Sequence, residues 1–342
     1  MTRTVTIGKI KIGGGNPVAI QSMTTADTKD TEAVLSQIEL LKKAGCEIVR
    51  LAAYDVEAAK NFKNIKDRTD MPLVADVHFD YKIAIAAIEA GADKVRINPG
   101  NIGSKEKTAM VARAAKMHGI PIRVGANTGS LKKELANENR SEALVKSALL
   151  NIRELEEQGF YDIVVSLKSS DVINTVRAYR KMSETVDYPL HLGVTEAGIY
   201  SSSVVKSSIG IGGLLIDGIG DTVRASVTGD PVKEIALAKD ILRYSGVRSF
   251  GCEVIACPTC ARTKIDIESL AEKVSEATKN IDKNLKIAVM GCVVNGPGEA
   301  READIGIAGG KNEGLIFIKG EPYKKVSEDK LLDELLVLIE RL

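Results

Sequence analysis

Eight short runs rich in β-branched residues recur between about residues 17 and 245, and longer amphipathic stretches separate them. This alternation is typical of βα units built around a parallel sheet. The predicted strands are 18–21, 47–51, 73–77, 94–97, 121–124, 162–166, 190–193 and 222–226, and clear helices are 31–44, 80–90, 142–158 and 171–185. Eight units predict an α/β fold of the (β/α)8 TIM-barrel type, with an open doubly wound sheet as the alternative.

The alternation stops near residue 245. The rest of the sequence predicts a short strand, a helix at 267–280, strands at 286–290, 304–308 and 315–319, and a terminal helix from about residue 328. Such a mixture indicates a smaller α+β module. We therefore expect a barrel domain over residues 1–245 and a second domain over residues 246–342.

The charge balance of the chain limits the classes of molecule that it is expected to bind. The 342 residues include 47 Lys and Arg and 46 Asp and Glu, which gives a formal net charge of +1. No overall field attracts such a chain to nucleic acid or to an anionic membrane, so any anion must be recognised locally. No apolar signal core or bilayer-length apolar stretch is visible. We expect a cytoplasmic protein that binds neither nucleic acid nor membranes, with its five cysteines reduced.

Basic side chains gather at the predicted carboxyl ends of the barrel strands, where active sites of such barrels lie. Five strands supply one cation each: Arg50, Arg96, Arg123, Lys168 and Arg224. Guanidinium groups pair with phosphate oxygens through two parallel hydrogen bonds, so this set fits a substrate with two phosphates. A single strand-end arginine is more often part of an ion pair at the rim, but five on five strands favour a binding site.

Acid–base candidates lie at the same predicted opening. The third strand carries Asp76 and leads to His78, and Glu196 follows the seventh strand. A carboxyl group held near cations or in a closed pocket can exchange protons, which makes Glu196 a candidate general acid. Asn127 begins a polar loop that could bind phosphate, with a turn or capping role as an equal alternative.

Three cysteines stand on glycine- and proline-rich turns of the second domain, namely Cys257, Cys260 and Cys292. Neighbouring thiolates are ligands for zinc and for iron–sulfur clusters. With Cys252 as a fourth ligand, the spacing matches a plant-type two-iron cluster or structural zinc. With Glu299 instead, the set would hold a four-iron cluster. Spacing alone favours four cysteines, although Cys252 lies in an apolar run that predicts a core position.

Six longer segments resemble one known family. They are residues 21–25, 74–80, 96–103, 191–198, 256–260 and 291–299. In all six the chain resembles the bacterial 4-hydroxy-3-methylbut-2-enyl diphosphate synthases, which act on 2-C-methyl-D-erythritol 2,4-cyclodiphosphate in the non-mevalonate pathway of isoprenoid biosynthesis. No inserted domain separates the eighth unit from the cysteine-bearing domain, so the resemblance is to the short form of this family.

The resemblance implies a barrel followed by an iron–sulfur domain. It implies a [4Fe-4S] cluster held by Cys257, Cys260, Cys292 and Glu299, with Cys252 outside the ligand set. It further implies that the five barrel cations bind the substrate's diphosphate, with Asn127 and His78 nearby, and that Glu196 transfers a proton. An iron whose only protein ligand is Glu299 can exchange that oxygen for substrate, which gives Glu299 a catalytic role as well.

The implied reaction is a reductive ring opening with loss of a hydroxyl group as water. No Gly-x-Gly-x-x-Gly motif opens a helix after a strand, so we infer no bound nicotinamide or flavin. The resemblance implies an oxidoreductase that takes electrons from reduced flavodoxin or ferredoxin. It also implies a homodimer in which one subunit's cluster domain covers the partner's barrel. The alternatives are a metal-stabilised electron-transfer or phosphometabolite-binding barrel protein, and a transferase resembling the dihydropteroate synthases.

Overall fold

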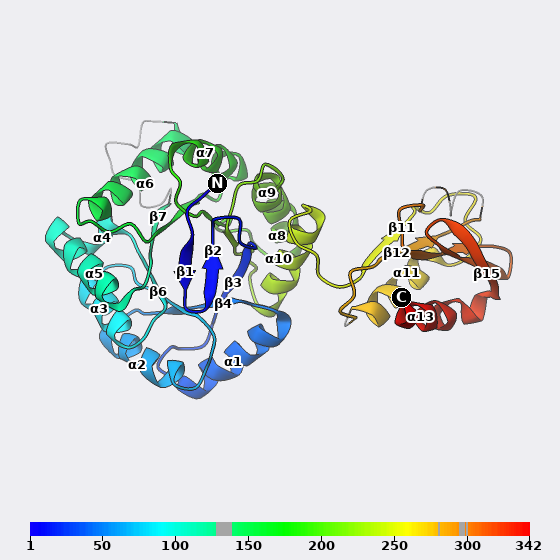
Figure 1. Ribbon diagram of the computed structural model, residues 1–342, viewed down its shortest axis with the longest axis horizontal. Coiled ribbons are helices and arrows are strands. Elements are labelled where there is room, and N and C mark those ends of the chain that lie inside the picture. Colours follow the sequence, from blue (N-terminus) through cyan, green and yellow to red (C-terminus); the bar gives the residue numbers. More distant parts are fainter. Residues whose placement is uncertain (128–138, 280, 294–297, 299) are drawn as a thin grey trace. The chain divides into compact units, whose positions relative to one another are not determined.

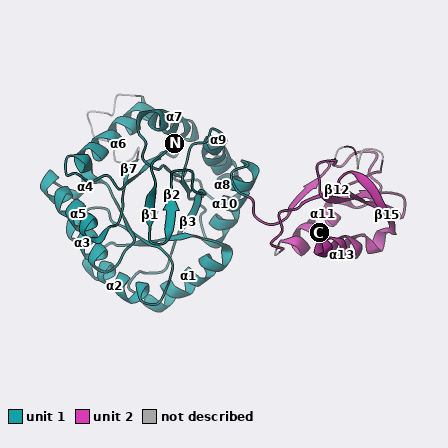
Figure 2. Ribbon diagram, viewed as in Figure 1, with its two compact units in different colours: residues 1–248 teal, residues 249–342 magenta. Residues whose placement is uncertain are grey.

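The computed structural model describes residues 1–127, 139–279, 281–293, 298 and 300–342. The chain divides into two units, residues 1–248 and residues 249–342 (Figure 2). Each unit has its own sheet and its own packed helices (Figure 1). Within the described ranges, none of the helices combines the length and the apolar character that crossing a bilayer requires.

The first unit is an eight-stranded parallel barrel surrounded by helices (Figure 1). Its strands are β3 (Ala19–Met23), β4 (Ile48–Ala52), β5 (Leu73–Asp76), β6 (Lys94–Ile97), β7 (Ile122–Asn127), β8 (Ile163–Lys168), β9 (His191–Leu192) and β10 (Thr222–Val223). They pair in the order β8-β7-β6-β5-β4-β3-β10-β9. A bridge between Val165 and Leu190 joins the two ends of this series. The predicted (β/α)8 fold is therefore confirmed, and the open sheet is excluded.

The helices of this unit lie where the amphipathic stretches predict them. They are α1 (Thr31–Ala44), α2 (Val56–Lys66), α3 (Tyr81–Glu89), α4 (Pro99–Ile102), α5 (Lys105–His118), α6 (Arg140–Glu156), α7 (Val172–Thr185), α8 (Tyr200–Ser207), α9 (Gly213–Ile216) and α10 (Val232–Tyr244). The ends of α1 show why its bounds are readable from sequence. The Asp30 carboxylate accepts a hydrogen bond from the Ala33 amide, and Gly45 ends the helix at φ 97°.

An antiparallel hairpin covers the amino-terminal end of the barrel. Its strands are β1 (Val5–Ile7) and β2 (Ile10–Ile12). Three buried hairpin side chains, Val5, Ile7 and Ile12, pack against Ala19, Ile48, Val74 and Val164 at or near the starts of four barrel strands. The hairpin thus closes the end of the barrel opposite the carboxyl ends of the strands.

The helical segment after β9 contains a π-helical turn, Ser208–Gly212, between α8 and α9. Gly210 in this turn packs closely against Val194. A Cβ added at Gly210 would lie only 2.6 Å from Cγ2 of Val194. The absence of a side chain at Gly210 therefore lets the helix approach the segment that leads to Glu196.

The second unit is built on a five-stranded mixed sheet in the order β11-β12-β13-β14-β15. Its elements are β11 (Glu253–Ala256), α11 (Ile267–Thr278), β12 (Lys286–Met290), β13 (Ile305–Gly309), β14 (Glu313–Ile318), β15 (Glu321–Ser327), a 3-10 turn (Glu328–Lys330) and α13 (Leu331–Arg341). Strands β11, β12 and β13 are parallel, so their carboxyl ends share one edge. The α+β character that the sequence predicts is confirmed.

Candidate active site

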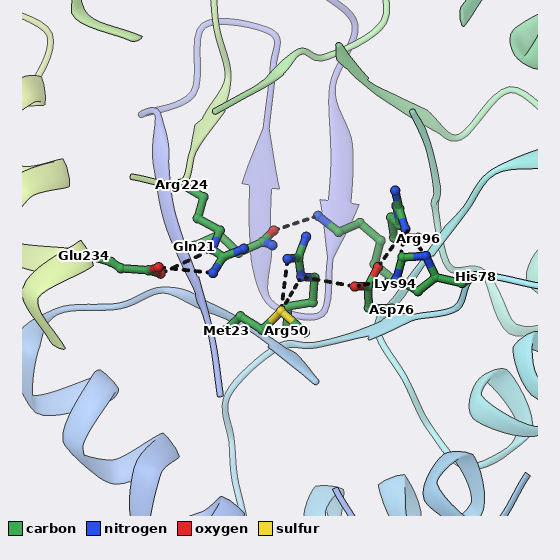
Figure 3. A network of polar contacts seen from close by, with 9 residues as sticks. All are labelled: Gln21, Met23, Arg50, Asp76, His78, Lys94, Arg96, Arg224 and Glu234. Carbon is green, nitrogen blue, oxygen red and sulfur yellow. Dashed lines mark hydrogen bonds and ion pairs between the residues drawn. The ribbon is translucent and has the colours of Figure 1, made fainter. Parts of the chain in front are cut away.

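Cations from several barrel strands extend into the barrel interior (Figure 3). Arg50 on β4 is 6% exposed, and Arg123 on β7 is completely buried. Lys168 ends β8, and its pKa is lowered well below the ordinary value by burial and by the charges of the four arginines of the predicted site. The structure therefore brings the five predicted cations into one electrostatic neighbourhood, although β7 continues to Asn127 and Arg123 is its second residue, not its end.

The Asp76 carboxylate, at the end of β5, is surrounded by two of these cations and by His78. It lies 3.3 Å from Nη1 of Arg96, 3.8 Å from Nε of Arg50 and 3.4 Å from Nε2 of His78. Burial alone would raise the pKa of Asp76, but the neighbouring positive charges, that of Arg50 first, hold this pKa well below its usual value. Asp76 is therefore an ionised anchor that orients cations, and it is not suited to donate a proton.

Arg50 is oriented from two sides. Its Nε and Nη2 lie 3.1 and 3.0 Å from the Met23 sulfur, and its Nε faces Asp76. Burial, together with the charges of Arg224 and Arg96, lowers the pKa of Arg50 to about 10 despite the carboxylate. Because neighbouring cations repel the charge of Arg50, a negative charge placed beside Arg50 would stabilise its protonated form strongly.

Arg224 follows β10 and is held by a carboxylate that the sequence analysis did not single out. Its Nε and Nη2 donate to the two carboxylate oxygens of Glu234 at 3.2 and 3.1 Å. Glu234, in the first turn of α10, is 3% exposed and also accepts from the Ser22 hydroxyl and the Val227 amide. This two-point contact fixes the plane of the Arg224 guanidinium.

The buried Arg123 side chain has donors without acceptors. In the part of the chain that the structure describes, none of its three guanidinium nitrogens has a hydrogen-bond partner. Burial, followed by the charges of Arg50 and Arg96, lowers its pKa well below the ordinary value. Buried donors without acceptors are costly, so this group is suited to receive an anion.

His191 on β9 is a neutral neighbour of this cluster. Its Nδ1 lies 2.7 Å from the Thr222 hydroxyl, and its Nε2 has no partner among the described residues. Burial, with Arg123 and Lys168 next, lowers the pKa of His191 well below its ordinary value. The imidazole therefore adds no charge to the barrel interior.

The remaining predicted contact residues lie at the rim. Asn127 ends β7 directly beside Lys168 in the parallel ladder. His78 is about half exposed, and its ring nitrogens lie 3.2 and 3.3 Å from Nη1 of Arg96. The structure therefore joins His78 to the Asp76 cluster. Residues 128–138, which continue the predicted polar loop, lie outside the described residues.

Glu196 has an unusual backbone conformation. It is exposed, and its φ of 55° lies in the left-handed region that non-glycine residues rarely occupy. The Lys206 amine on α8 donates to the Glu196 carbonyl oxygen at 3.2 Å. Strained backbone of this kind is frequent at functional sites and requires support from its surroundings. The contact from Lys206 is one such support.

Lys94 and Gln21 are two polar residues of the barrel interior that the sequence analysis did not assign to the site. The Lys94 amine donates to Oε1 of Gln21 at 3.3 Å (Figure 3). Lys94 is 0% exposed and Gln21 is 1% exposed. The only signal in the sequence is the alternation of Lys94 with Arg96 along β6, which places both on one face of the strand.

In the second unit, contacts through Gly291 bring together the turns that carry the three predicted thiols. Cys257 follows β11, and Cys292 comes two residues after β12. The Gly291 amide lies 3.3 Å from the Cys257 sulfur. A Cβ at Gly291 would lie 2.9 Å from the hydroxyl of Thr263, which in turn accepts a hydrogen bond from the Cys260 amide. The turns thus approach closely only because Gly291 has no side chain.

The donor set fits a soft metal centre. The backbone amide of Arg262 lowers the pKa of the exposed Cys260 thiol, which favours the thiolate form that binds metal. Among the described residues, no three His, Cys, Asp or Glu side chains are close enough together to hold a metal ion. Glu299, the predicted fourth ligand, lies outside the described residues. Cys252 packs against the hydrophobic core and points its sulfur to the Lys283 carbonyl oxygen at 3.5 Å.

Both units match domains of a single family. The profile of the GcpE TIM-barrel domain matches residues 2–239. The profile of the GcpE protein C-terminal domain matches residues 253–341. Together the two matches extend over nearly the whole chain.

Three curated relatives carry one name, 4-hydroxy-3-methylbut-2-en-1-yl diphosphate synthase (flavodoxin). The protein of Caldanaerobacter subterraneus subsp. tengcongensis is 57% identical, over 100% of this chain and 97% of its own length. The protein of Clostridium perfringens is 55% identical, over 99% and 98%. The protein of Thermotoga maritima is 52% identical, over 100% and 98%.

Solved structures of two other enzymes resemble part of this chain. The crystal structure of Yersinia pestis dihydropteroate synthase superposes with a TM-score of 0.53 at 12% identity, over 72% of this chain and 98% of that chain. Type I 3-dehydroquinate dehydratase of Clostridium difficile gives a TM-score of 0.53 at 15% identity, over 73% and 100%. At such low identity these likenesses show the fold alone.

Proposed function

The chain belongs to the GcpE family, and from this premise we propose that it converts 2-C-methyl-D-erythritol 2,4-cyclodiphosphate to 4-hydroxy-3-methylbut-2-enyl diphosphate. The reaction is a reductive ring opening and dehydration in the non-mevalonate pathway of isoprenoid biosynthesis. The observation that carries the proposal is the 57% identity, over the full chain, to a relative named for the synthesis of this product.

The barrel residues bind the substrate's diphosphate. Arg50, Arg96, Arg123, Lys168 and Arg224 supply the positive charge, and Asn127 and His78 supply further polar contacts. This role is supported by the unsatisfied nitrogens of Arg123 and by the carboxylates Asp76 and Glu234, which hold two of the other arginines in place. Guanidinium groups held in fixed planes are positioned to make bidentate hydrogen bonds to phosphate oxygens.

Glu196 exchanges a proton with the bound substrate. Its exposed position, four residues after β9, lies beyond the carboxyl end of that strand, where the reacting part of a bound substrate would lie. The left-handed backbone and the contact from Lys206 support this role, because they fix the direction in which the side chain leaves the main chain. Proton transfer requires that such a group be positioned before it reacts.

The second unit holds a [4Fe-4S] cluster through Cys257, Cys260, Cys292 and Glu299. When bound, the cluster supplies electrons and an iron that acts as a Lewis acid. The amide of Gly291 donates to the Cys257 sulfur at 3.3 Å, a contact that orients this ligand. Cys252 remains outside the ligand set, as the resemblance to the family implies, and its sulfur contacts the Lys283 carbonyl oxygen.

The electron donor is reduced flavodoxin, and ferredoxin is the alternative carrier of the same type. The relatives are named as flavodoxin enzymes. The working form is a homodimer, in which the cluster domain of one subunit completes the site in the barrel of its partner.

An anaerobic assay tests the proposal directly. The reconstituted protein is mixed with the cyclodiphosphate and a chemical reductant, and formation of the linear diphosphate is followed. We expect turnover by the wild-type protein and its loss in a Glu299→Gln variant that retains its iron. Absence of product from protein with an intact four-iron cluster would refute the function. A metal-stabilised electron-transfer or metabolite-binding protein would accept electrons or bind the diphosphate without forming product.

A further inference from the structure

Lys94 is a charged residue for which the proposed reaction has no assigned use. It opens β6 two positions before Arg96, so both side chains lie on the inward face of the strand. At about 3.3 Å per residue, Lys94 begins roughly 6.6 Å deeper in the barrel than Arg96. Its side chain is completely buried.

The partners of the Lys94 amine do not include an anion. Its one described hydrogen bond is the 3.3 Å contact to Oε1 of Gln21, whose own Nε2 has no partner among the described residues. No carboxylate in the described part of the chain lies within ion-pair distance of Lys94; Asp76 pairs with other cations, and Glu234 pairs with Arg224. An ammonium ion in this position would be buried without compensation.

The surrounding strands make the environment more positive. Arg50, Asp76 and Arg224 face the barrel interior from other strands, and Glu234 of α10 lies beside Arg224 (Figure 3). Arg123 and His191 are fully buried on β7 and β9, and Lys168 ends β8. The two negative groups, Asp76 and Glu234, already contact Arg96 and Arg224. Burial first, and then the charges of Arg123 and Arg50, lower the pKa of Lys94 well below its ordinary value.

We propose that Lys94 is neutral in the unliganded barrel and takes up a proton when a diphosphate binds among the strand-end cations. The inference rests on the proposed function, because it takes the anion to be the substrate's diphosphate. The proton comes from solvent, and only the N–H bond of the ammonium ion is formed. The negative charge of the ligand then offsets repulsion from Arg50 and Arg123, so Lys94 adds positive charge only when the site is occupied.

Calorimetry on the intact, anaerobically reconstituted chain measures this uptake. Inorganic pyrophosphate is titrated at one pH in two buffers with different heats of ionisation, which gives the number of protons taken up per ligand bound. The proteins are wild type, Lys94→Met and, as a matched control, Lys60→Met at an exposed lysine of α2. The ligand's own protonation contributes to all three, so the difference between them reports on Lys94.

We expect wild type and Lys60→Met to take up about one proton more than Lys94→Met. As pH rises from 7 to 9, the dissociation constant of wild type should increase more steeply than that of Lys94→Met, with a difference that approaches about tenfold per pH unit. If Lys94→Met does not fold, Lys94→Gln provides the same comparison.

Two outcomes would overturn the inference, and they are distinguishable. Equal proton uptake in wild type and in a Lys94 variant that binds pyrophosphate would mean that Lys94 does not change its protonation, and the proposed function would stand. Failure of both wild type and Lys60→Met to bind pyrophosphate would remove the diphosphate site itself, and the inference with it.

Discussion

At the scale of single residues, Lys94 links the proposed site to stability. The unfolded chain protonates this amine with its ordinary pKa of 10.5, whereas the folded barrel lowers that pKa well below this value. The unfolded state therefore binds more protons, and the free energy of unfolding must rise with pH toward the ordinary value. Relative to Lys94→Met, wild type should gain up to about 1.4 kcal/mol per pH unit as pH rises from 7 to 10.

Urea unfolding of the barrel at several pH values measures this difference. Lys60→Met again serves as the control and should follow the wild-type curve. Parallel curves for wild type and Lys94→Met would show that the amine stays protonated in the folded barrel.

Glu234 provides a second test at this scale. Its carboxylate accepts from Arg224, Ser22 and the Val227 amide in a buried position. Glu234→Gln keeps the size of the side chain but removes the negative charge, which leaves Arg224 without its ion pair. We expect a loss of about 2–3 kcal/mol in the free energy of unfolding, measured by denaturant titration.

The matched control for this change is Glu57→Gln. Glu57 contacts Lys29 at the surface, with a side chain 78% exposed, so its loss should cost no more than about 0.5 kcal/mol. Similar small losses for both variants would contradict a structural role for the contact between Glu234 and Arg224.

The sequence predicts some of these residues better than others for a physical reason. Four of the five cations lie near or beyond the carboxyl ends of their strands, where the barrel geometry brings side chains together, whereas Arg123 is the second residue of β7. Glu234 lies on a helix, and only the folded chain turns it toward Arg224. Lys94 opens its strand, where a lysine usually reaches solvent. Nothing in a single sequence signals that the hairpin of β1 and β2 covers this end of the barrel.

At the scale of elements, a substitution in the π-helical turn after α8 can test how the chain positions Glu196. A Cβ at Gly210 would lie 2.6 Å from Cγ2 of Val194. Gly210→Ala should therefore shift the helix or the segment after β9, with a loss of about 1–3 kcal/mol in stability. Because Lys206 on the same helix supports Glu196, we also expect kcat to fall more than substrate affinity.

Gly213→Ala is the control within the same segment. Gly213 has a helical backbone, and among the described residues a Cβ there would meet no atom within 4 Å beyond its chain neighbours and its own helix backbone. Alanine should therefore be neutral or slightly stabilising at this position. Thermal unfolding and steady-state kinetics of the two variants give the comparison. Equal losses of stability and activity in the two variants would mean that the close approach of Gly210 to Val194 does not cause them.

Long helices can be predicted from the sequence because their apolar periodicity and their capping residues are both local features. Helix α1 has the predicted bounds, which Asp30 and Gly45 fix. The hairpin of β1 and β2 and the edge strand β15 cannot be predicted from such local patterns. The hairpin strands are 3 residues each, too short to show a period, and β15 is mostly exposed, so it lacks an apolar face. Tertiary pairing decides these elements.

At the scale of the whole molecule, the charge distribution matters more than the total. The chain has a formal net charge of +1, yet the barrel interior gathers several cations around the carboxylates Asp76 and Glu234. Compensating acidic residues therefore lie elsewhere on the chain. Such a distribution attracts a small anion into one opening without attracting nucleic acid to the surface. The balanced composition and the cationic site are thus compatible.

The proposed homodimer predicts that two inactive chains can restore each other. Arg96→Ala removes a cation from the barrel, and Glu299→Gln removes the proposed ligand from the second unit. If each site combines a barrel with the partner's cluster domain, a heterodimer of these chains has one fully intact site. Random mixing of equal amounts makes half of the dimers mixed, so activity should reach about a quarter of the wild-type value.

Differently tagged chains allow the mixed dimers to be isolated before anaerobic assay. Each variant mixed with itself serves as the control and should remain inactive. If isolated mixed dimers show no recovery, the site cannot be shared in this way, because a site within one subunit would be defective in both chains. Recovery of activity therefore reports whether both subunits contribute to one site.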